Sequence, residues 1–170
     1  MKSSLNELEK QAVKVGLILR IQVRRPFNLW AIKLVVAEKT KQGKIQIWGE
    51  MKAWAYNAAN GLQLDTMRVN PRAPKGVAHL IWASTMAWAL EETPCKNARL
   101  LAIRDGEKQH ATLVRYFINH GFNSIKEVGS SPLDLPLRMI WGGSGLLMKG
   151  NCLKVFLISQ RNWKLKYEFS

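Results

Sequence analysis

The sequence contains few cysteines, and this shortage excludes the small secreted proteins that disulfides hold together. Only two are present, Cys95 and Cys152. They are too few for a disulfide framework, and neither belongs to a Cys-x-x-Cys pair. We therefore expect a reducing compartment, which favours the cytoplasm.

A long apolar run is also missing, which argues against a membrane span. The longest such run covers residues 77–90 and is interrupted by His79, Ser84 and Thr85. A span needs roughly 20 predominantly apolar residues. The N-terminal residues are polar and mixed in charge, and lack the apolar core of a signal peptide. We expect a soluble protein with no membrane partner.

Acidic residues are scarce relative to basic ones. The chain of 170 residues has 26 lysines and arginines against 12 aspartates and glutamates, a formal charge of +14. This excess indicates contact with something acidic, such as a phosphorylated cofactor, nucleic acid or an acidic protein surface. The cations are spread from Lys2 to Lys166, so charge alone identifies no partner. No linker or repeat divides the chain, and we expect a single domain over residues 1–170.

Residues 64–90 have the pattern of a strand, a turn and a helix. Bulky residues end at Val69, two prolines follow, and an apolar-striped helix begins near Lys75. The first turn of a helix has unpaired N–H groups and a partial positive charge, so this junction can bind an anion. Gly76 would let a ligand approach the backbone, and Arg72 and Lys75 add full charges. The alternative is an ordinary turn whose basic residues lie in solvent.

A second stretch, residues 98–128, repeats the order of strand and helix. A continuously apolar run at 99–103 predicts a central strand buried on both faces. A helix over about 107–120 follows, with Gly121 placed at its end. Residues 122–128 then form a strand.

The chain before residue 64 predicts one helix and several strands. Ser4 can cap a helix that extends to about Val15. Residues 17–24 alternate as a strand would, although the helix could also continue there. Further strands are predicted at 29–39, at 44–56 and from 62 onwards, the last after an Asn60-Gly61 hairpin turn.

These stretches resemble a GCN5-related N-acetyltransferase (GNAT). Val69-Asn70-Pro71 followed by Gly76-Val77-Ala78 is similar to the pyrophosphate-binding loop of that family, and Gly121-Phe122 resembles the end of its next helix. The family's arginine or glutamine three residues before the first loop glycine corresponds to Ala73, and Arg72 stands one position earlier. The matched parts cover about residues 29–128.

The resemblance implies a mixed α/β fold with a mostly antiparallel sheet of about six or seven strands and flanking helices. Two central parallel strands would splay apart around acetyl-CoA, whose amides would pair with the freed backbone groups. The implied activity is transfer of an acetyl group to a primary amine of a small molecule or protein. The implied cofactor contacts are Met67, Arg68, Val69, Arg72, Lys75, Gly76, Val77, Ala78, His79, His110 and Phe117.

Acyl transfer needs an uncharged amine, donors near the developing oxyanion and a proton source for the thiolate. The family's frequent tyrosine acid corresponds to Phe117, and the adjacent Tyr116 points about 100° away around the helix. Protonation would come from Tyr116, another group or water; otherwise the domain binds the cofactor without turnover. Glu50 and Asp65 are candidate general bases, although the simpler interpretation, a solvated strand residue, is favoured for each.

The histidines do not form a metal-site pattern, and two of the tryptophans favour the core. His79, His110 and His120 lack the tight spacing and the neighbouring Cys, Asp or Glu cluster of a metal site, so no metal is expected. Trp82 and Trp88 have helical spacing and are expected in the core rather than in an acceptor pocket.

Residues 146–170 are expected to form a strand-rich extension. The tail alternates apolar and polar residues between Leu153 and Phe169, and such a ribbon rarely stands alone in water. It would complete the sheet or pair with a second subunit in a homodimer. Residues 138–141 are another candidate strand, followed by a glycine-rich loop on the acceptor side.

A second function, from a different class, is a basic binding module. Such a module would be a GNAT-like fold that has lost turnover and holds CoA, nucleic acid or an acidic protein. Nucleic acid is the less favoured partner, because the sequence shows no helix-turn-helix, no zinc-finger spacing and no aromatic RNA-binding motif.

Overall fold

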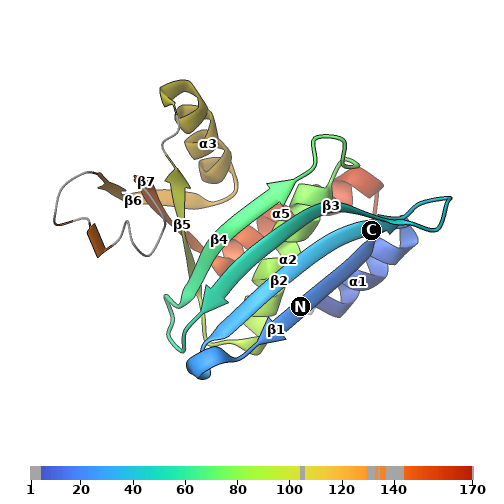
Figure 1. Cartoon of the computed structure of the whole chain (residues 1–170), viewed down its shortest axis with the longest axis horizontal. Coiled ribbons are helices and arrows are strands. Elements are labelled where there is room, and N and C mark those ends of the chain that lie inside the picture. The colour runs from blue at the N-terminus through green and yellow to red at the C-terminus, as the bar shows by residue number, and fades with distance from the viewer. Residues whose placement is uncertain (1–4, 104–105, 130–132, 134, 137–143, 170) are drawn as a thin grey trace.

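The computed structural model describes residues 5–103, 106–129, 133, 135–136 and 144–169. They form a mixed α/β fold around one seven-stranded sheet in the order β1-β2-β3-β4-β5-β7-β6 (Figure 1). Among these strands, β4 and β5 are the parallel pair, and the other neighbours run antiparallel. The strands are β1 (Ile18–Arg24), β2 (Trp30–Lys39), β3 (Ile45–Ala55), β4 (Leu62–Val69), β5 (Asn97–Ile103), β6 (Phe122–Val128) and β7 (Gly145–Asn151). The helices are α1 (Leu5–Lys14), η1 (Pro26–Asn28), α2 (Val77–Glu92), α3 (Glu107–Asn119) and α5 (Cys152–Tyr167).

The helices and strands predicted before residue 129 are confirmed, while Ser4, the predicted cap of the first helix, lies outside the described residues. For residues 17–24, where a strand and a longer helix were both open, the structure has the strand β1. Gly16 explains this outcome, because it adopts a left-handed backbone (φ 79°) and turns the chain from α1 into β1. The N–H of Leu17 then donates to the carbonyl of Ala12 (2.9 Å), which closes the end of the helix.

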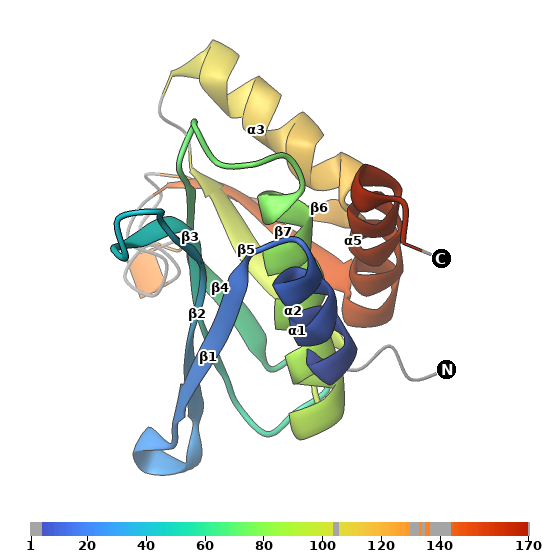
Figure 2. The same ribbon diagram turned by 90° about the vertical axis from the view of Figure 1, so that its right-hand side faces the viewer.

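One face of the β1–β4 part of the sheet is covered by helices. Figure 2 shows α1, α2 and α5 on the same side of these strands. On β2, Leu34 and Val36 are fully buried on this side, whereas Lys33 is exposed on the other. The alternation follows the period of two that a strand imposes on its side chains. Charged side chains therefore gather on the face opposite the helices.

α2 is the centre of the hydrophobic core. Eleven of its sixteen residues are buried, including the large side chains of Trp82, Met86 and Trp88. A helix that is apolar on all sides needs neighbours on all sides. The sheet covers one side of α2, and α1 and α5 pack against it as well.

The prediction of a strand-rich tail is wrong after Asn151, because residues 152–167 form helix α5. The side chain of Asn151 caps this helix by accepting a hydrogen bond from the N–H of Lys154 (3.0 Å). The buried residues of α5 form a stripe with helical spacing that faces α2. Leu153 and Leu157 are exposed, and they produce the apolar–polar alternation that predicted a strand. The tail therefore covers the core and neither completes the sheet nor offers a strand to a second subunit. The buried stripe is Cys152, Val155, Phe156, Ser159, Gln160 and Trp163.

β7 is the strand predicted at 146–149, and it lies between β5 and β6. The candidate strand at 138–141 and the first part of the glycine-rich loop lie outside the described residues. Within the described chain, no helix combines the length and the apolar character that crossing a membrane requires.

Candidate active site

β4 and β5 pair only where they begin. Their parallel register joins Leu62 to Ala98 and Gln63 to Arg99, and the strands then diverge (Figure 1). Beyond Gln63, the edge of β4 that faces β5 has no partner strand among the described residues. Backbone N–H and C=O groups on such an edge need other partners. The divergence also corrects the prediction for β5, which is buried on one face only: Ile103 is 51% exposed.

The divergence opens a cavity of about 360 Å³, which we call the splay cleft. Its size is within the range of small-molecule sites. Most of its wall is apolar, with Asp65, Thr66 and Arg68 as the polar side chains. The lining residues are Met51 of β3, Leu64, Asp65, Thr66, Met67 and Arg68 of β4, Trp82 of α2, Leu100, Leu101 and Ile103 of β5, and Leu113 and Phe117 of α3.

α3 separates the splay cleft from a second hollow of about 530 Å³, the α3 groove. Leu113 lines both, so the two hollows adjoin. Phe117 lines the cleft, whereas Tyr116 lines the α3 groove. This split follows from the helical rotation of about 100° between neighbours. The other lining residues of the groove are Lys108, Gln109 and Thr112.

The Tyr116 hydroxyl is tied to the wall of the cleft. It accepts a hydrogen bond from the indole N–H of Trp82 (3.0 Å). Burial raises the pKa of Tyr116, and the bond from Trp82 opposes that shift. The hydroxyl therefore stays protonated at neutral pH, and it holds the Trp82 ring in place.

Gly76 adopts a left-handed backbone (φ 94°) immediately before α2. A Cβ atom added there would lie 3.0 Å from Tyr167 and 3.2 Å from Trp163, so α5 fills the space beside its Cα. The Tyr167 hydroxyl also donates to the carbonyl of Lys75 (2.7 Å). The close approach that the sequence assigned to a ligand is thus made by α5. Arg72 and Lys75 are exposed beside this junction, while Val77 is buried and Ala78 half-buried.

His79 and His120 stack beside the N-terminus of α2, with ring centroids 5.8 Å apart. His120 Nδ1 lies 2.8 Å from the carbonyl of Tyr116, and because a carbonyl only accepts, this nitrogen carries the proton. His120 Nε2 and His79 Nδ1 are buried and have no hydrogen-bond partner among the residues that the structure describes. Burial lowers the pKa of both imidazoles, and in His79 the neighbouring His120 and Lys166 lower the pKa further.

The two candidate bases lie in different surroundings. Asp65 lines the splay cleft and stands at an irregularity of β4, where Lys52 pairs with Thr66 and Ala53 pairs with Leu64. Glu50 lies outside the cleft, with its carboxylate 3.8 Å from the ammonium of Lys33. The structure therefore brings only Asp65 to the cleft.

The remaining predicted contacts are divided around the cleft. Met67 and Arg68 line it, whereas Val69 lines a separate hollow that it shares with Glu50 and Arg68. His110, in the first turn of α3, has Nδ1 3.2 Å from the carbonyl of Ile103, so it connects α3 to the end of β5. Among the described residues, no three His, Cys, Asp or Glu side chains gather as metal ligands would.

Sequence reasoning missed three contributors to the site. Trp82 was expected in the core, and it is both buried and a wall of the cleft. Tyr167 and Trp163 of α5 were missed at the α2 junction because the tail was expected to be a strand. The helical spacing of the buried stripe in α5 was the signal that could have placed them.

No protein-family model matches the chain, and no curated protein matches its sequence. Solved structures resemble it in fold. Nourseothricin acetyltransferase has a TM-score of 0.52 at 13% identity, over 85% of this chain and 93% of its own. A spermidine N-acetyltransferase SpeG chimera from Vibrio cholerae and hSSAT has a TM-score of 0.50 at 13% identity, over 90% of this chain and 80% of its own. FdhC, a nucleotide-linked sugar GNAT, has a TM-score of 0.51 at 9% identity, over 81% of this chain and 64% of its own.

Proposed function

We propose, from the GNAT fold that this chain has, that the protein transfers an acetyl group from acetyl-CoA to a primary amine. The observation that carries this proposal is the divergence of β4 and β5, which opens the splay cleft through the sheet. Two proteins that share the fold are acetyltransferases, which supports acetyl transfer as the reaction.

The residues of the cleft fit acetyl-CoA. The unpaired edge of β4 at Met67 and Arg68 would bind its amides, and Trp82 and Phe117 would pack on its apolar arm. Its phosphates would lie at the N-terminus of α2, where the helix dipole and Lys75 favour anions.

Further groups around that junction also suit phosphates. Arg72 adds a charge, and Lys166 of α5 lies near enough to His79 to lower its pKa. His79 Nδ1, which has no hydrogen-bond partner among the described residues, and the first-turn N–H of Ala78 complete the surroundings. The N–H of Val77 donates to the carbonyl of Pro74 (3.4 Å). Because α5 occupies one side of the loop at Gly76, the phosphates would approach from a side that α5 leaves open.

When bound, acetyl-CoA supplies an acetyl thioester whose carbonyl carbon an uncharged amine can attack. Asp65 is the proposed proton acceptor for the amine, since it is the candidate base that lines the cleft. Phe117 cannot donate a proton, and the Tyr116 hydroxyl is held at Trp82. We propose that water protonates the leaving thiolate and that Tyr116 positions Trp82.

A second candidate function rests on Phe117. A cleft without a tyrosine hydroxyl suits a domain that binds CoA but turns over slowly or not at all. General acids typically contribute about 10²–10⁴-fold to a rate, so this loss is large. Such a domain would bind acetyl-CoA and CoA alike and would release no free thiol in the presence of amines.

Calorimetric titration with acetyl-CoA, and in parallel with CoA, tests the proposal. We expect micromolar binding that Leu101→Trp, a change that fills the cleft, weakens by at least about tenfold. Ile45→Trp is the matched control, because Ile45 is 59% exposed at the start of β3 and lines none of the hollows described above.

A second arm of the titration tests the phosphate position. Lys75→Glu should weaken binding, and Lys154→Glu, an exposed charge reversal on α5, should not. Absence of binding would refute the proposal. Equal losses of affinity in Leu101→Trp and Ile45→Trp would show that the cofactor does not bind in the splay cleft.

A further inference from the structure

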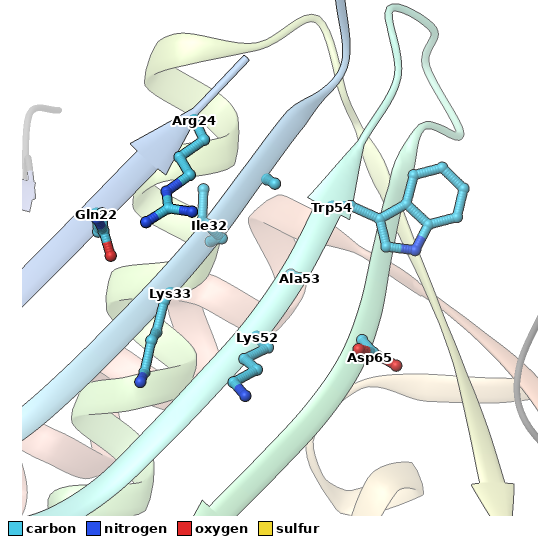
Figure 3. Close-up of a pocket in the computed structure, with 9 residues that line it drawn as sticks. Gln22, Arg24, Ile32, Lys33, Lys52, Ala53, Trp54 and Asp65 are labelled. Atoms are coloured by element: carbon cyan, nitrogen blue, oxygen red, sulfur yellow. The ribbon is translucent and has the colours of Figure 1, made fainter. Parts of the chain in front are cut away.

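A shallow pocket of about 460 Å³ lies on the face of β1–β4 opposite the helices, and we call it the outer pocket. Figure 3 shows its side chains on the near face of the strands, with helices behind them. The volume is within the range of small-molecule sites. The lining residues are Gln22, Arg24, Ala31, Ile32, Lys33, Lys52, Ala53, Trp54 and Asp65.

Three cations from three neighbouring strands line this pocket: Arg24 of β1, Lys33 of β2 and Lys52 of β3. Lys33 and Lys52 face each other directly in the sheet. Like charges in opposite positions destabilise a strand pair, and a bound anion would relieve that repulsion. Lys33 has Glu50 within 3.8 Å, whereas Arg24 and Lys52 form no ion pair within the described part of the chain.

Trp54 supplies an apolar wall. Its indole is half-buried and extends over β4, the strand that carries Asp65 (Figure 3). An aromatic face of this kind packs against the carbon skeleton or the ring of a ligand. The pocket therefore combines anion-binding groups with one apolar surface.

Asp65 connects the outer pocket with the splay cleft, because it lines both. It has no opposite residue in β3, since the register passes from Lys52–Thr66 to Ala53–Leu64. A ligand held by the cations of the outer pocket can therefore place an ammonium group at the Asp65 carboxylate, at the entrance to the cleft.

We infer that the outer pocket binds the amine acceptor and that this acceptor is a small molecule carrying an anionic group, a carboxylate or a phosphate. The inference rests on the proposed function for the identity of the ligand as an acceptor. The anionic group binds Arg24 and Lys52, and the amine lies at Asp65. The same cations repel a polycation such as spermidine.

Matched amines test the inference. Phosphoethanolamine is compared with ethanolamine to test a phosphate, and β-alanine is compared with propylamine to test a carboxylate. Spermidine serves as the polycation. Initial rates of CoA thiol release should be at least about tenfold higher for one anionic amine than for its neutral partner and for spermidine. Equal rates, or a preference for spermidine, would overturn the inference and leave the proposed function standing.

A second readout needs no acetyl-CoA. In a ¹H–¹⁵N NMR titration, the effective anionic amine should shift the indole N–H signal of Trp54, assigned with Trp54→Phe. Lys52→Gln and Arg24→Gln should weaken this binding by at least about tenfold, and Lys39→Gln, exposed on β2 outside the pocket, should not.

The two readouts separate the two proposals. A Trp54 shift without any binding of acetyl-CoA would refute the proposed function but support the pocket. No shift with any of the amines, or a shift only with a single-stranded oligonucleotide or an acidic peptide, would overturn the inference.

Discussion

The indole N–H of Trp163 in α5 donates a 2.9 Å hydrogen bond to the side-chain oxygen of Gln11 in α1, and both side chains are buried. The bond joins residues 152 positions apart in the chain. The bond therefore connects α1 with α5, the first and the last helix. The sequence predicted no such contact, because residues 152–167 were expected to form a strand.

This bond predicts a coupled loss of stability. Trp163→Phe leaves the Gln11 oxygen buried without a donor, which costs about 1–3 kcal/mol in addition to the lost packing. We expect a double-mutant cycle of Trp163→Phe and Gln11→Met to show a coupling of about 1 kcal/mol in the free energy of unfolding, measured with denaturant. Additive effects would contradict the buried bond.

Gly76 should tolerate alanine poorly. Its φ of 94° disfavours any side chain, and the added Cβ would lie 3.0 Å from Tyr167. Gly43→Ala is the matched control, because Gly43 has a φ of 81° and no atom of the described residues lies within 4 Å of its added Cβ. We expect Gly76→Ala to lower the free energy of unfolding by roughly 1–3 kcal/mol more than Gly43→Ala. Equal losses would show that α5 does not pack on this glycine.

Local signals explain how far the fold could be predicted. Period-two alternation, the Asn60-Gly61 turn and the glycine at position 121 are properties of short segments, and the elements they predicted are present. The prediction for the tail was wrong because exposed Leu153 and Leu157 add apolar positions with the period of a strand to a segment whose buried residues have the period of a helix. The cap at Asn151 and the burial of the stripe against α2 stabilise the helix over a strand.

The site was harder to predict than the fold, because it depends on contacts between distant segments. The loop glycine was found from its motif, but its neighbour Tyr167 bonds to Lys75 across 92 positions. Asp65 was one of two equal candidates until the register of β4 put it, and not Glu50, at the cleft. The outer pocket has no motif in the sequence, because its cations come from three separate strands.

Acidification should weaken the fold through His79 and His120. Burial lowers the pKa of both below the ordinary value of 6.5, so the unfolded chain binds protons first as the pH falls. The contribution of these two histidines to the free energy of unfolding should therefore decrease from about pH 6.5 downward and stay level above it. His120→Asn, which keeps a donor for the Tyr116 carbonyl, should reduce this dependence in denaturant melts.

The less buried His110 provides the control for that experiment. It also bonds a carbonyl through Nδ1, at 3.2 Å from Ile103. If His110→Asn changed the pH dependence as much as His120→Asn, burial of His120 would not be its cause.

Both cysteines should resist thiol reagents in the folded protein. Cys95 is 1% and Cys152 0% exposed, and burial raises the pKa of Cys152 to about 12, with Cys95 as a second cause. Because the thiolate is the reactive form, labelling with dithionitrobenzoate at pH 8 should be slow until denaturant is added. Ala111→Cys, on the exposed side of α3, is the positive control. Fast labelling of the unmodified native protein would contradict the burial of these two thiols.

Exchange of the aromatic pair on α3 tests the source of the thiolate proton. Phe117→Tyr places a hydroxyl at the wall of the splay cleft, and we expect kcat for acetyl transfer to rise by about tenfold or more. Tyr116→Phe leaves the Trp82 N–H without its acceptor, which should cost about 1 kcal/mol of stability while kcat falls by less than about threefold. Steady-state kinetics and denaturant melts on the two variants measure both effects. If Tyr116→Phe instead abolished turnover while the Kd for acetyl-CoA stayed unchanged, Tyr116 would be the proton donor, and water would not.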